Sequence, residues 1–395
     1  MLRRLAFKPA ESTAAIRRSI TLSPKPEAMS KPPYRVPSMS EIAAVQWNGY
    51  TVVSTFSGCG GSCLGYRMAG FRVVWANEFV PSAQDSYRAN MAPDSILDGR
   101  DIRTVQADDI LKVTGLEQGA LDVLDGSPPC QAFSTAGKGE KGWGKGKRYE
   151  HGAVQKNEEL FTEYIRILRG LKPRSFVAEN VSGLVKGTAK GYFLEILAGL
   201  KASGYRVTCK VLDAQWLGVP QCRQRVIFIG MREDLKLDPV HPKPLGYRYS
   251  VRDALPWIDE IRQVGVFDEP GRVTAPAMTA HGMGAKRRGS VEVIIGNDAF
   301  ESKWGPPDSP ATTVTTATTK QMGWVRNKEK PEERRKFTIA ELKRICAFPD
   351  DFQLTGSYAQ AWSCLGNAVP PVTMAAIARE VAGVLRASGQ TASQG

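Results

Sequence analysis

The chain has few of the residues that build disulfide frameworks and metal sites. Its seven cysteines are an odd number at irregular spacing, without a CxxC pair, and it has only three histidines. Both counts argue against a disulfide scaffold and a zinc site, so we expect no metal. No apolar run approaches the roughly 20 residues that span a bilayer, and no hydrophobic signal core follows the N-terminus. These absences fit a reducing, aqueous compartment and no membrane segment.

The composition is that of a globular protein with a basic surface. Of the 395 residues, 42% are hydrophobic and 24% are charged, which suffices for one large core and a smaller domain. Lysine and arginine number 53 against 40 acidic residues, giving a formal net charge of +13. This excess favours an anionic partner, most simply nucleic acid, although many basic proteins bind none.

Both ends of the chain lack sustained periodicity. Residues 1–47 are rich in Pro, Ser, Arg and Lys, which predicts a mostly disordered leader, and residues 389–395 predict a disordered tail. "MLRRLAFKPAESTAAIRRS" is basic and nearly free of acid, as in an organelle transit peptide. We favour the alternative of an over-extended start, with Met29 as another initiator and a cytoplasmic protein.

From residue 51 onward, short buried strands alternate with helices. The runs "TVVSTF", "FRVVWANE", "LDVLDG", "RSFVAEN", "YRVTCKVL" and "RVIFIG" are β-branched and aromatic, as in buried strands. Helical patterns lie between them at about 62–69, 80–91, 157–171 and 191–203. This alternation predicts an α/β fold with a mostly parallel sheet. The last two strands are too close for a crossover helix, so we expect an antiparallel pair at one edge.

Two helices show one apolar face each. At helical spacing, the first presents Leu160, Phe161, Tyr164, Ile165, Leu168 and Leu171. The last, near the C-terminus, presents Met374, Ile377, Ala378, Val381 and Leu385.

Residues 235–334 have a different texture, rich in Pro, Gly, Thr and basic residues with little periodicity. We interpret them as a separate, irregular module. Its segments "HGMGAKRRGS" and "ATTVTTATTKQMG" would offer cations and hydroxyls to phosphates and base edges. The alternative is a solvated linker with a charge run.

A glycine-rich turn and an acidic residue predict a nucleotide-type site. "FSGCGG", residues 56–61, follows the first strand and precedes the first helix, where glycines let a ligand approach backbone N–H groups. Glu78 ends the second strand, 20 residues after Gly58, in the position that accepts hydrogen bonds from a ribose. Together they indicate an adenosine-containing cofactor. The sequence has neither the Gly-Lys-Ser/Thr of a phosphate-binding P-loop nor the strict GxGxxG pattern, and such a turn alone can simply pack a helix on a sheet.

Three more polar groups follow later strands. Cys130 lies after the third run, in "LDGSPPCQAFS", and Glu179 ends the next strand in "AEN". "QCRQR" then supplies Gln221, Arg223 and Arg225 beside the final strand. Because open α/β sheets place reactive groups at the carboxyl ends of their strands, a thiol, a carboxyl and an arginine could converge there. A lone cysteine is more often a small buried hydrophobe, and only the combination favours a nucleophile.

These motifs resemble one known family. "FSGCGG", "NEF", "DI", "GSPPCQAFS", "ENV", "QCRQR" and "GNAVPP" stand in the order and approximate spacing of the cytosine-5 DNA methyltransferases, across about residues 51–386. The resemblance implies S-adenosylmethionine as cofactor and a Rossmann-like catalytic and cofactor-binding domain at 48–234. It further implies a target-recognition domain at 235–334 and a C-terminal segment, 335–388, that returns to pack beside the first strand.

The resemblance also implies residue roles. Cys130 would add to carbon 6 of an extruded cytosine, Glu179 would hold N3 and the exocyclic amine, Arg225 would contact O2, and Arg223 would support the carboxylate. The cofactor would be bound by the residues that match the family's pocket: Phe56, Gly58, Gly60, Glu78, Phe79, Asp101, Ile102, Pro129, Leu160, Asn367 and Val369.

The expected partner is double-stranded DNA, bound by a monomer, with a separately encoded restriction endonuclease as a further candidate partner. One departure from the family concerns "EKGWGKGKRYEHGAVQKNEELF", which lacks the usual Asp-x-Arg before the next helix, so the anchoring of the loop over the base is less certain than the chemistry. Two rival functions are an RNA (tRNA) cytosine-5 methyltransferase with the same site and a catalytically dead binding module.

Overall fold

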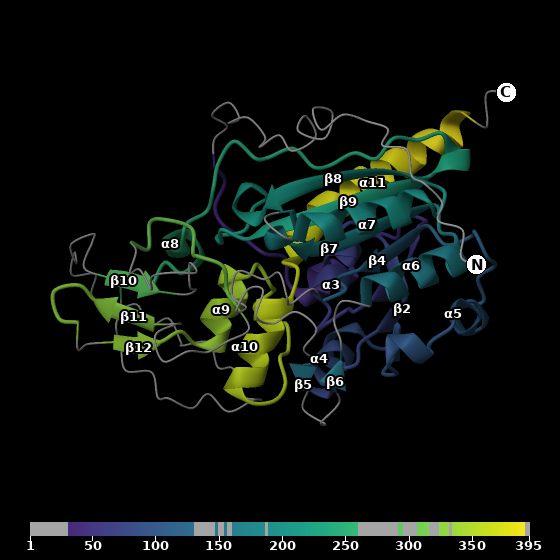
Figure 1. Ribbon diagram of the computed structural model, residues 1–395. Coiled ribbons are helices and arrows are strands. Elements are labelled where there is room, and N and C mark those ends of the chain that lie inside the picture. The colour runs from purple at the N-terminus through teal and green to yellow at the C-terminus, as the bar shows by residue number, and fades with distance from the viewer. Residues whose placement is uncertain are drawn as a thin grey trace.

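The computed structural model describes residues 31–129, 147–148, 154–155, 160–185, 189–259, 291–294, 306–315, 324–331 and 334–391. In this part of the chain, a seven-stranded sheet lies between two layers of helices. A three-stranded sheet lies at one end of the molecule, with α9 (Ile339–Ile345) and α10 (Tyr358–Asn367) between the two sheets (Figure 1).

The large sheet has the predicted α/β arrangement. Its strands lie in the order β3 (Ile96–Asp98), β2 (Arg72–Asn77), β1 (Thr51–Thr55), β4 (Val123–Gly126), β7 (Ser175–Val181), β9 (Gln224–Arg232) and β8 (Tyr205–Asp213). The first five pair in parallel. β9 is antiparallel to both neighbours. The predicted antiparallel pair at one edge is therefore confirmed, whereas the three-residue β3 escaped prediction because it is too short to show a period.

Alternation along the strands separates two cores. Val52 of β1 is buried with residues of α3 (Gly61–Met68), α4 (Pro81–Met91) and α11 (Pro371–Thr391). Val53, the next residue, is buried on the other face with residues of α5 (Ala107–Thr114), α6 (Leu160–Leu171) and α7 (Lys190–Lys201). Because successive side chains point to opposite faces, one apolar strand can serve both cores.

Helix α6 buries nearly the predicted stripe. Leu160, Phe161, Tyr164, Leu168 and Leu171 are buried, but Ile167 replaces Ile165 as the sixth buried residue. Ile165 is only partly covered and packs at the margin of the same core. The apolar face is therefore turned slightly from the one that the spacing predicted.

The C-terminal helix α11 packs directly on α3. Its five predicted core residues are all at most 1% exposed. A Cβ atom on Gly65 of α3 would lie 2.5 Å from the Pro371 carbonyl oxygen and 2.6 Å from Met374 Cβ, so only glycine allows this approach. The stretch Tyr358–Ala387 is long and apolar enough to cross a membrane, but 61% of its apolar window is buried inside the protein. It breaks at residues 368–370 into two helices that belong to the core.

The predicted leader boundary at residue 47 is wrong. Residues 31–47 are folded, and they include the short helix α2 (Met39–Ala43). Ser38 caps α2 by accepting from the Glu41 N–H, and the Glu41 carboxylate accepts from the Ser38 N–H. Ile42, the apolar residue of this turn, is buried against α3 and α11. Residues 1–30 lie outside the described residues.

The region predicted as irregular contains a small antiparallel sheet. Its strands are β10 (Val291–Ile294), β11 (Trp324–Asn327) and β12 (Arg334–Lys336), and β12 crosses the predicted domain boundary at 334. Strands of three and four residues are too short to produce a visible period. Arg335 of β12 forms a buried bidentate ion pair with Glu341, at 2.7 Å on both arms, which attaches the small sheet to α9.

Candidate active site

The glycine-rich turn lies at the carboxyl end of β1 and leads into α3. Phe56, Gly58 and Gly60 have φ values of +54°, +56° and +98°. The Ser57 N–H donates to the Asn77 carbonyl at 2.9 Å, which fixes the turn to the end of β2. Gly60 is the N-cap of α3, so the N-terminal N–H groups of this helix lie beside the turn.

Glu78 completes this turn from the neighbouring strand. Its Oε2 accepts from the Gly58 N–H at 2.8 Å and its Oε1 accepts from the Val80 N–H at 2.7 Å. Burial raises the pKa of the Glu78 carboxyl, and the backbone hydrogen bonds oppose this rise. Each carboxylate oxygen keeps a further lone pair, which leaves acceptors for a ligand hydroxyl.

The turn borders open space at Gly58. A Cβ atom built on Gly58 would meet nothing within 4 Å, so the glycine leaves a gap beside the backbone where a bulkier residue would project. Asp101 caps the short 3-10 helix Ile102–Thr104 after β3, and Ile102 is buried. Phe79 is half-buried beside Glu78, and Leu160 lies fully buried at the described start of α6.

The segment "GNAVPP" reaches the same edge from the far end of the chain. A Cβ atom on Gly61, the first residue of α3, would lie 2.5 Å from the Val369 carbonyl oxygen. Val369 is buried and Asn367 is exposed. The structure thus brings Val369 against the start of the helix that follows the glycine turn.

The strand that precedes the predicted nucleophile ends at this edge as well. A Cβ atom on Gly126 would lie 2.5 Å from Thr55 Oγ1 and 2.6 Å from Tyr164 Cε2, so β4 can leave the sheet here only with glycine. Asn180 Nδ2 donates to the Pro128 carbonyl at 3.2 Å and holds the Pro-Pro segment against β7. Pro129 is half-buried and is the last described residue before a gap. Cys130 itself lies outside the described residues.

Glu179 and Arg225 meet across the β7–β9 pair. Arg225 Nε lies 2.7 Å from Glu179 Oε1, and Arg225 Nη1 donates to the Gln224 carbonyl at 2.8 Å. Oε1 is buried and accepts no well-aligned hydrogen bond, so the contact is an ion pair without a directed bond. The side chain of Arg225 is 18% exposed and that of Glu179 is 9% exposed. Both side chains are therefore mostly buried but not completely closed off from solvent.

The predicted role of Arg223 in supporting the Glu179 carboxylate stays a prediction, because Arg223 forms hydrogen bonds with backbone carbonyls while the nearby Glu179 charge acts to raise its pKa. Arg223 is buried, and its guanidinium donates to the carbonyls of Val314, Gly366 and Asn367 at 3.1, 3.0 and 3.4 Å. Burial, with Arg225 nearby, lowers the pKa of Arg223 to about 9. Arg223 thus joins "QCRQR" to "GNAVPP".

Sequence reasoning missed two residues of this region. Asn180 was read only as part of a motif, although its amide fixes the Pro128 carbonyl. Asp125 is fully buried beneath the Pro-Pro segment, where its carboxylate accepts from Ser54 Oγ at 2.9 Å and from the Tyr66 hydroxyl at 3.4 Å. Burial raises the pKa of the Asp125 carboxyl to about 7. An aspartate inside the hydrophobic run "LDVLDG" was the available signal.

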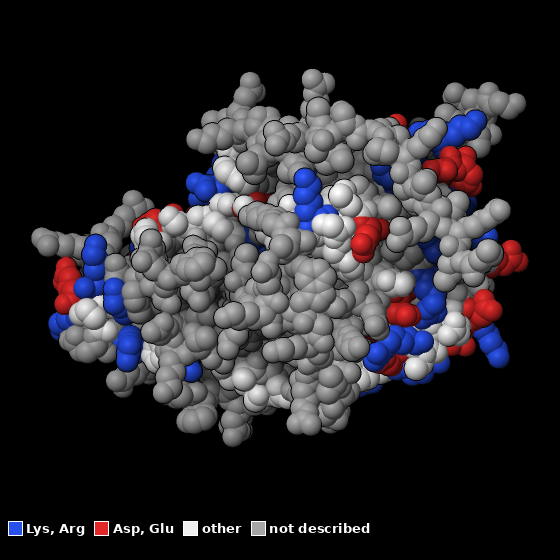
Figure 2. Space-filling view, in the orientation of Figure 1, with Lys and Arg blue, Asp and Glu red and all other residues white. Residues whose placement is uncertain are grey.

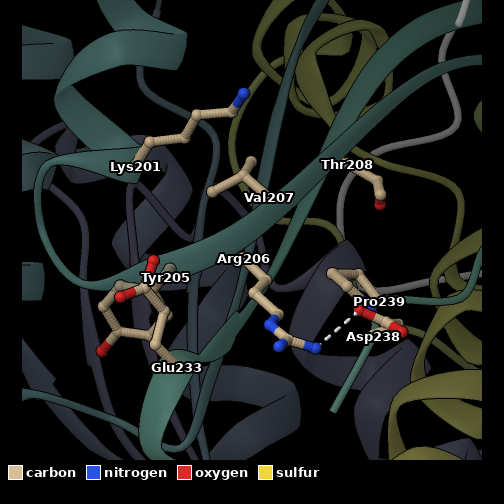
Figure 3. A pocket seen from close by; sticks show the side chains of 8 residues that line it. All are labelled: Lys201, Tyr205, Arg206, Val207, Thr208, Glu233, Asp238 and Pro239. Carbon is tan, nitrogen blue, oxygen red and sulfur yellow. Dashed lines mark hydrogen bonds and ion pairs between the residues drawn. The ribbon is translucent and has the colours of Figure 1, made fainter. Parts of the chain in front are cut away.

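One open hollow of the described surface lies elsewhere. It measures about 410 Å³ and is lined along β8 by residues 205–208, with Arg206 pairing to Asp238 at 3.0 Å across its floor (Figure 3). Tyr205, the first residue of β8, pairs with Arg232 of β9. The preceding residue of β9, Met231, pairs with Ser175, the first residue of β7. This hollow is therefore at the amino edge of the parallel strands, away from the site above.

The fold and the site define a class. A mostly parallel seven-stranded sheet with one antiparallel strand beside β7, and a glycine turn joined to an acidic residue, form the fold of S-adenosylmethionine-dependent methyltransferases. Solved structures agree with this fold. A putative DNA modification methyltransferase encoded within an E. coli prophage superposes with a TM-score of 0.61 at 21% identity, covering 86% of this chain and 100% of that chain. The S. pombe Dnmt2 methyltransferase gives 0.53 at 17% identity, covering 86% and 98%.

The sequence comparisons give the family. The C-5 cytosine-specific DNA methylases match residues 50–383. The type II methyltransferase M1.HphI of Haemophilus parahaemolyticus is 31% identical over 341 residues, which cover 84% of this chain and 86% of the relative. M.SacI of Streptomyces achromogenes is also 31% identical, covering 81% and 89%. The chain belongs to the C-5 cytosine-specific DNA methylases and is an enzyme of DNA methylation, as the motifs predicted.

Proposed function

We propose that this enzyme transfers a methyl group from S-adenosylmethionine to carbon 5 of a cytosine in a specific duplex DNA sequence. The ion pair of Glu179 and Arg225 at the carboxyl edge of the sheet carries this proposal, since it stands where β4 leads toward Cys130. A carboxyl and a guanidinium at one partly open spot suit the polar edge of a pyrimidine, which presents N3, an exocyclic amine and O2.

Cytosine carbon 5 needs activation before it accepts a methyl group. In our proposal the Cys130 thiolate adds to carbon 6, and Glu179 in its protonated form donates its proton to N3, fully or in a hydrogen bond, so that the ring electrons move toward carbon 5. Carbon 5 takes the methyl group, a base removes the carbon 5 proton, and elimination frees the thiol. Arg225 holds O2 and keeps the carboxyl oriented throughout.

The cofactor supplies a methyl group on a positively charged sulfur when it is bound. Its ribose would be held by the Glu78 carboxylate, and the part of the cofactor next to the ribose would lie against the turn of Phe56, Gly58 and Gly60. Phe79, Asp101, Ile102, Pro129, Leu160, Asn367 and Val369 would line the remainder of the pocket. Buried Ile102 and Leu160 share one core, which agrees with an apolar wall for adenine.

DNA would be bound by the small sheet. Lys328, Arg334 and Lys336 are exposed, and the Arg334 guanidinium and the Lys336 ammonium lie 5.1 and 5.7 Å from the Trp324 ring centre. Lys and Arg side chains are exposed together at this end of the molecule (Figure 2). The target base has to leave the duplex because its carbon 6 is covered by stacking neighbours. We further propose a cytoplasmic monomer and a separately encoded restriction endonuclease that shares the target sequence.

The test measures transfer of labelled methyl groups to duplex DNA and, separately, to tRNA. We expect cofactor-dependent labelling of DNA at carbon 5 of cytosine, in a fixed sequence that bisulfite sequencing of DNA from a methylation-free host reveals. Labelling of tRNA instead of DNA would replace this proposal with the RNA alternative. Absence of any transfer, together with intact cofactor binding, would favour a binding module.

A further inference from the structure

Residues 31–44, which we call the strap, contact both halves of the protein. At its beginning, Lys31 Nζ donates to both carboxylate oxygens of Asp253 at 2.9 and 2.8 Å, on the short helix α8 (Val251–Ala254). The Tyr249 hydroxyl donates to the Pro32 carbonyl at 3.1 Å. The rings of Tyr34 and Tyr249 meet edge to face, with centroids 5.0 Å apart.

The strap next contacts α9. The Tyr34 hydroxyl donates to the Arg344 carbonyl at 2.5 Å. Arg344 in turn donates from Nε to the Ala254 carbonyl at 2.7 Å and lies over the Trp257 ring at 5.1 Å. Burial raises the pKa of the Tyr34 phenol far above its ordinary value, so the hydroxyl stays a donor at every working pH. Tyr34, α8 and α9 thus form one connected group.

The end of the strap is fixed to the catalytic half. The Met39 N–H lies 3.0 Å from both carboxylate oxygens of Asp351. Ile42 is 4% exposed and is buried with Met68 of α3 and Ala375 of α11. This anchor lies on the helices that flank the cofactor turn, so the strap joins α8 to the cofactor-binding core.

Helix α8 binds segment 306–315, which lies with it in the predicted target-recognition domain. The N–H groups of Val251 and Arg252 donate to the carbonyls of Ser309 and Pro307 at 3.0 and 2.8 Å. Arg252 also pairs with Asp308 at 2.7 Å. Segment 306–315 continues to Val314 and Thr315, whose carbonyls accept from Arg223 and Trp362. A shift of α8 would therefore move a segment that ends next to the active site.

We propose that the strap is a specificity-determining segment: it fixes α8 and segment 306–315 relative to the cofactor-binding core, and thereby sets the position from which a target sequence is read. This inference rests on the proposed function. The strap precedes residues 50–383, the part of the chain that the family model matches.

The first test removes the two polar anchors on the recognition side and keeps the rest. In the full chain, Lys31→Ala combined with Tyr34→Phe deletes the Asp253 and Arg344 contacts and leaves both the Tyr34 ring and Ile42 in place. Arg35→Ala is the matched control, because it deletes an exposed ion pair with Glu41 inside the strap. The measurements are cofactor affinity and the ratio of kcat/KM for the methylated sequence to that for a duplex with one changed base pair.

We expect the double variant to lower this ratio on the order of tenfold, as small displacements near a reacting centre do, with cofactor affinity unchanged within a factor of about two. The control variant should keep both values. An unchanged ratio in the double variant would overturn the inference, and so would a parallel loss of cofactor affinity, since that would make the strap a general stabiliser of the fold.

A truncation pair provides a second, independent test of the strap. Deletion of residues 1–44 removes the strap, and deletion of residues 1–30 is the control. A synthetic peptide of residues 30–46 added to the shorter chain should restore the ratio. Backbone hydrogen exchange across residues 249–259 should accelerate only without the strap, and this readout requires no activity. If hydrogen exchange at residues 249–259 is unchanged by deletion of residues 1–44, the inference about the strap is refuted. If that deletion accelerates exchange but the control lacking residues 1–30 transfers no methyl group, only the proposed function is refuted.

Discussion

Glu179 and Arg225 are diagonal neighbours on one face of the β7–β9 pair. Glu179 is opposite Ile227 and Arg225 is opposite Val181, so the two charged side chains stand two positions apart on the same side of the sheet and reach 2.7 Å. The strand register, rather than a flexible loop, therefore sets their geometry.

This rigidity makes Glu179 a sharp target for mutation. We expect Glu179→Gln to lower the rate of methyl transfer by about two orders of magnitude or more, because a positioned acid is lost while the shape remains. Binding of duplex DNA and of cofactor should change little. Single-turnover kinetics separate these steps, and a variant that loses cofactor affinity instead would contradict the assigned role.

The covalent step can be trapped. Duplex DNA with 5-fluorocytosine at the target should form an adduct that survives denaturation, since fluorine cannot leave as a proton does. The adduct should require cofactor, contain the transferred methyl group and be absent from Cys130→Ala. Peptide mapping identifies the cysteine that is crosslinked to DNA, and a crosslink at Cys59, Cys63 or Cys222 would refute the mechanism.

Asp125 should make stability depend on pH. Its pKa is raised from 3.8 to about 7 in the folded protein. The neutral carboxyl therefore contributes stability that is fully present below about pH 4, declines as the pH rises, and is lost once the pH passes about 7. Asp125→Asn cannot ionise, so its melting temperature should exceed that of the wild type at pH 8 and nearly equal it at pH 4. The exposed Asp85→Asn is the control and should show no such divergence.

The contact between α3 and α11 should tolerate no side chain at Gly65. We expect Gly65→Ala to destabilise the protein by about 1–3 kcal/mol through overpacking, because the new Cβ would lie 2.5 Å from the Pro371 carbonyl oxygen. Gly383→Ala, on α11 with nothing within 4 Å, should instead be neutral or stabilising. Urea unfolding of the pair measures both effects, and equal midpoints would contradict the packing argument.

Binding of duplex DNA should weaken steeply with salt. Each phosphate neutralised by a lysine or arginine releases counterions, and the logarithm of affinity falls with a slope of about −0.9 per contact. Arg334→Ala and Lys336→Ala should each reduce that slope by about one and weaken binding to all sequences alike. Wild-type slopes in both variants would remove the small sheet from the phosphate-binding surface.

Local patterns predicted what depends on near neighbours in the sequence. The six longer strands of the large sheet, the glycine turn with Glu78 and the buried face of α11 follow from short local patterns, and the structure places them as expected. The contacts of Arg223 and Tyr34 could not be predicted this way, because their partners lie 91 to 310 residues away. One signal was available and unused: Ser38 followed by Glu41 is a capping box, which marks the start of a helix inside the supposed leader.

The close approach of α11 to α3 has a consequence for synthesis of the protein. The glycine turn and α3 precede most of the described elements in the chain, whereas α11, which covers α3, follows all of them. A nascent chain that has not yet reached residue 371 leaves the apolar face of α3 uncovered. The support of the glycine turn is therefore completed only after α11 has been synthesised, and a chain terminated before residue 371 would lack part of that supporting core.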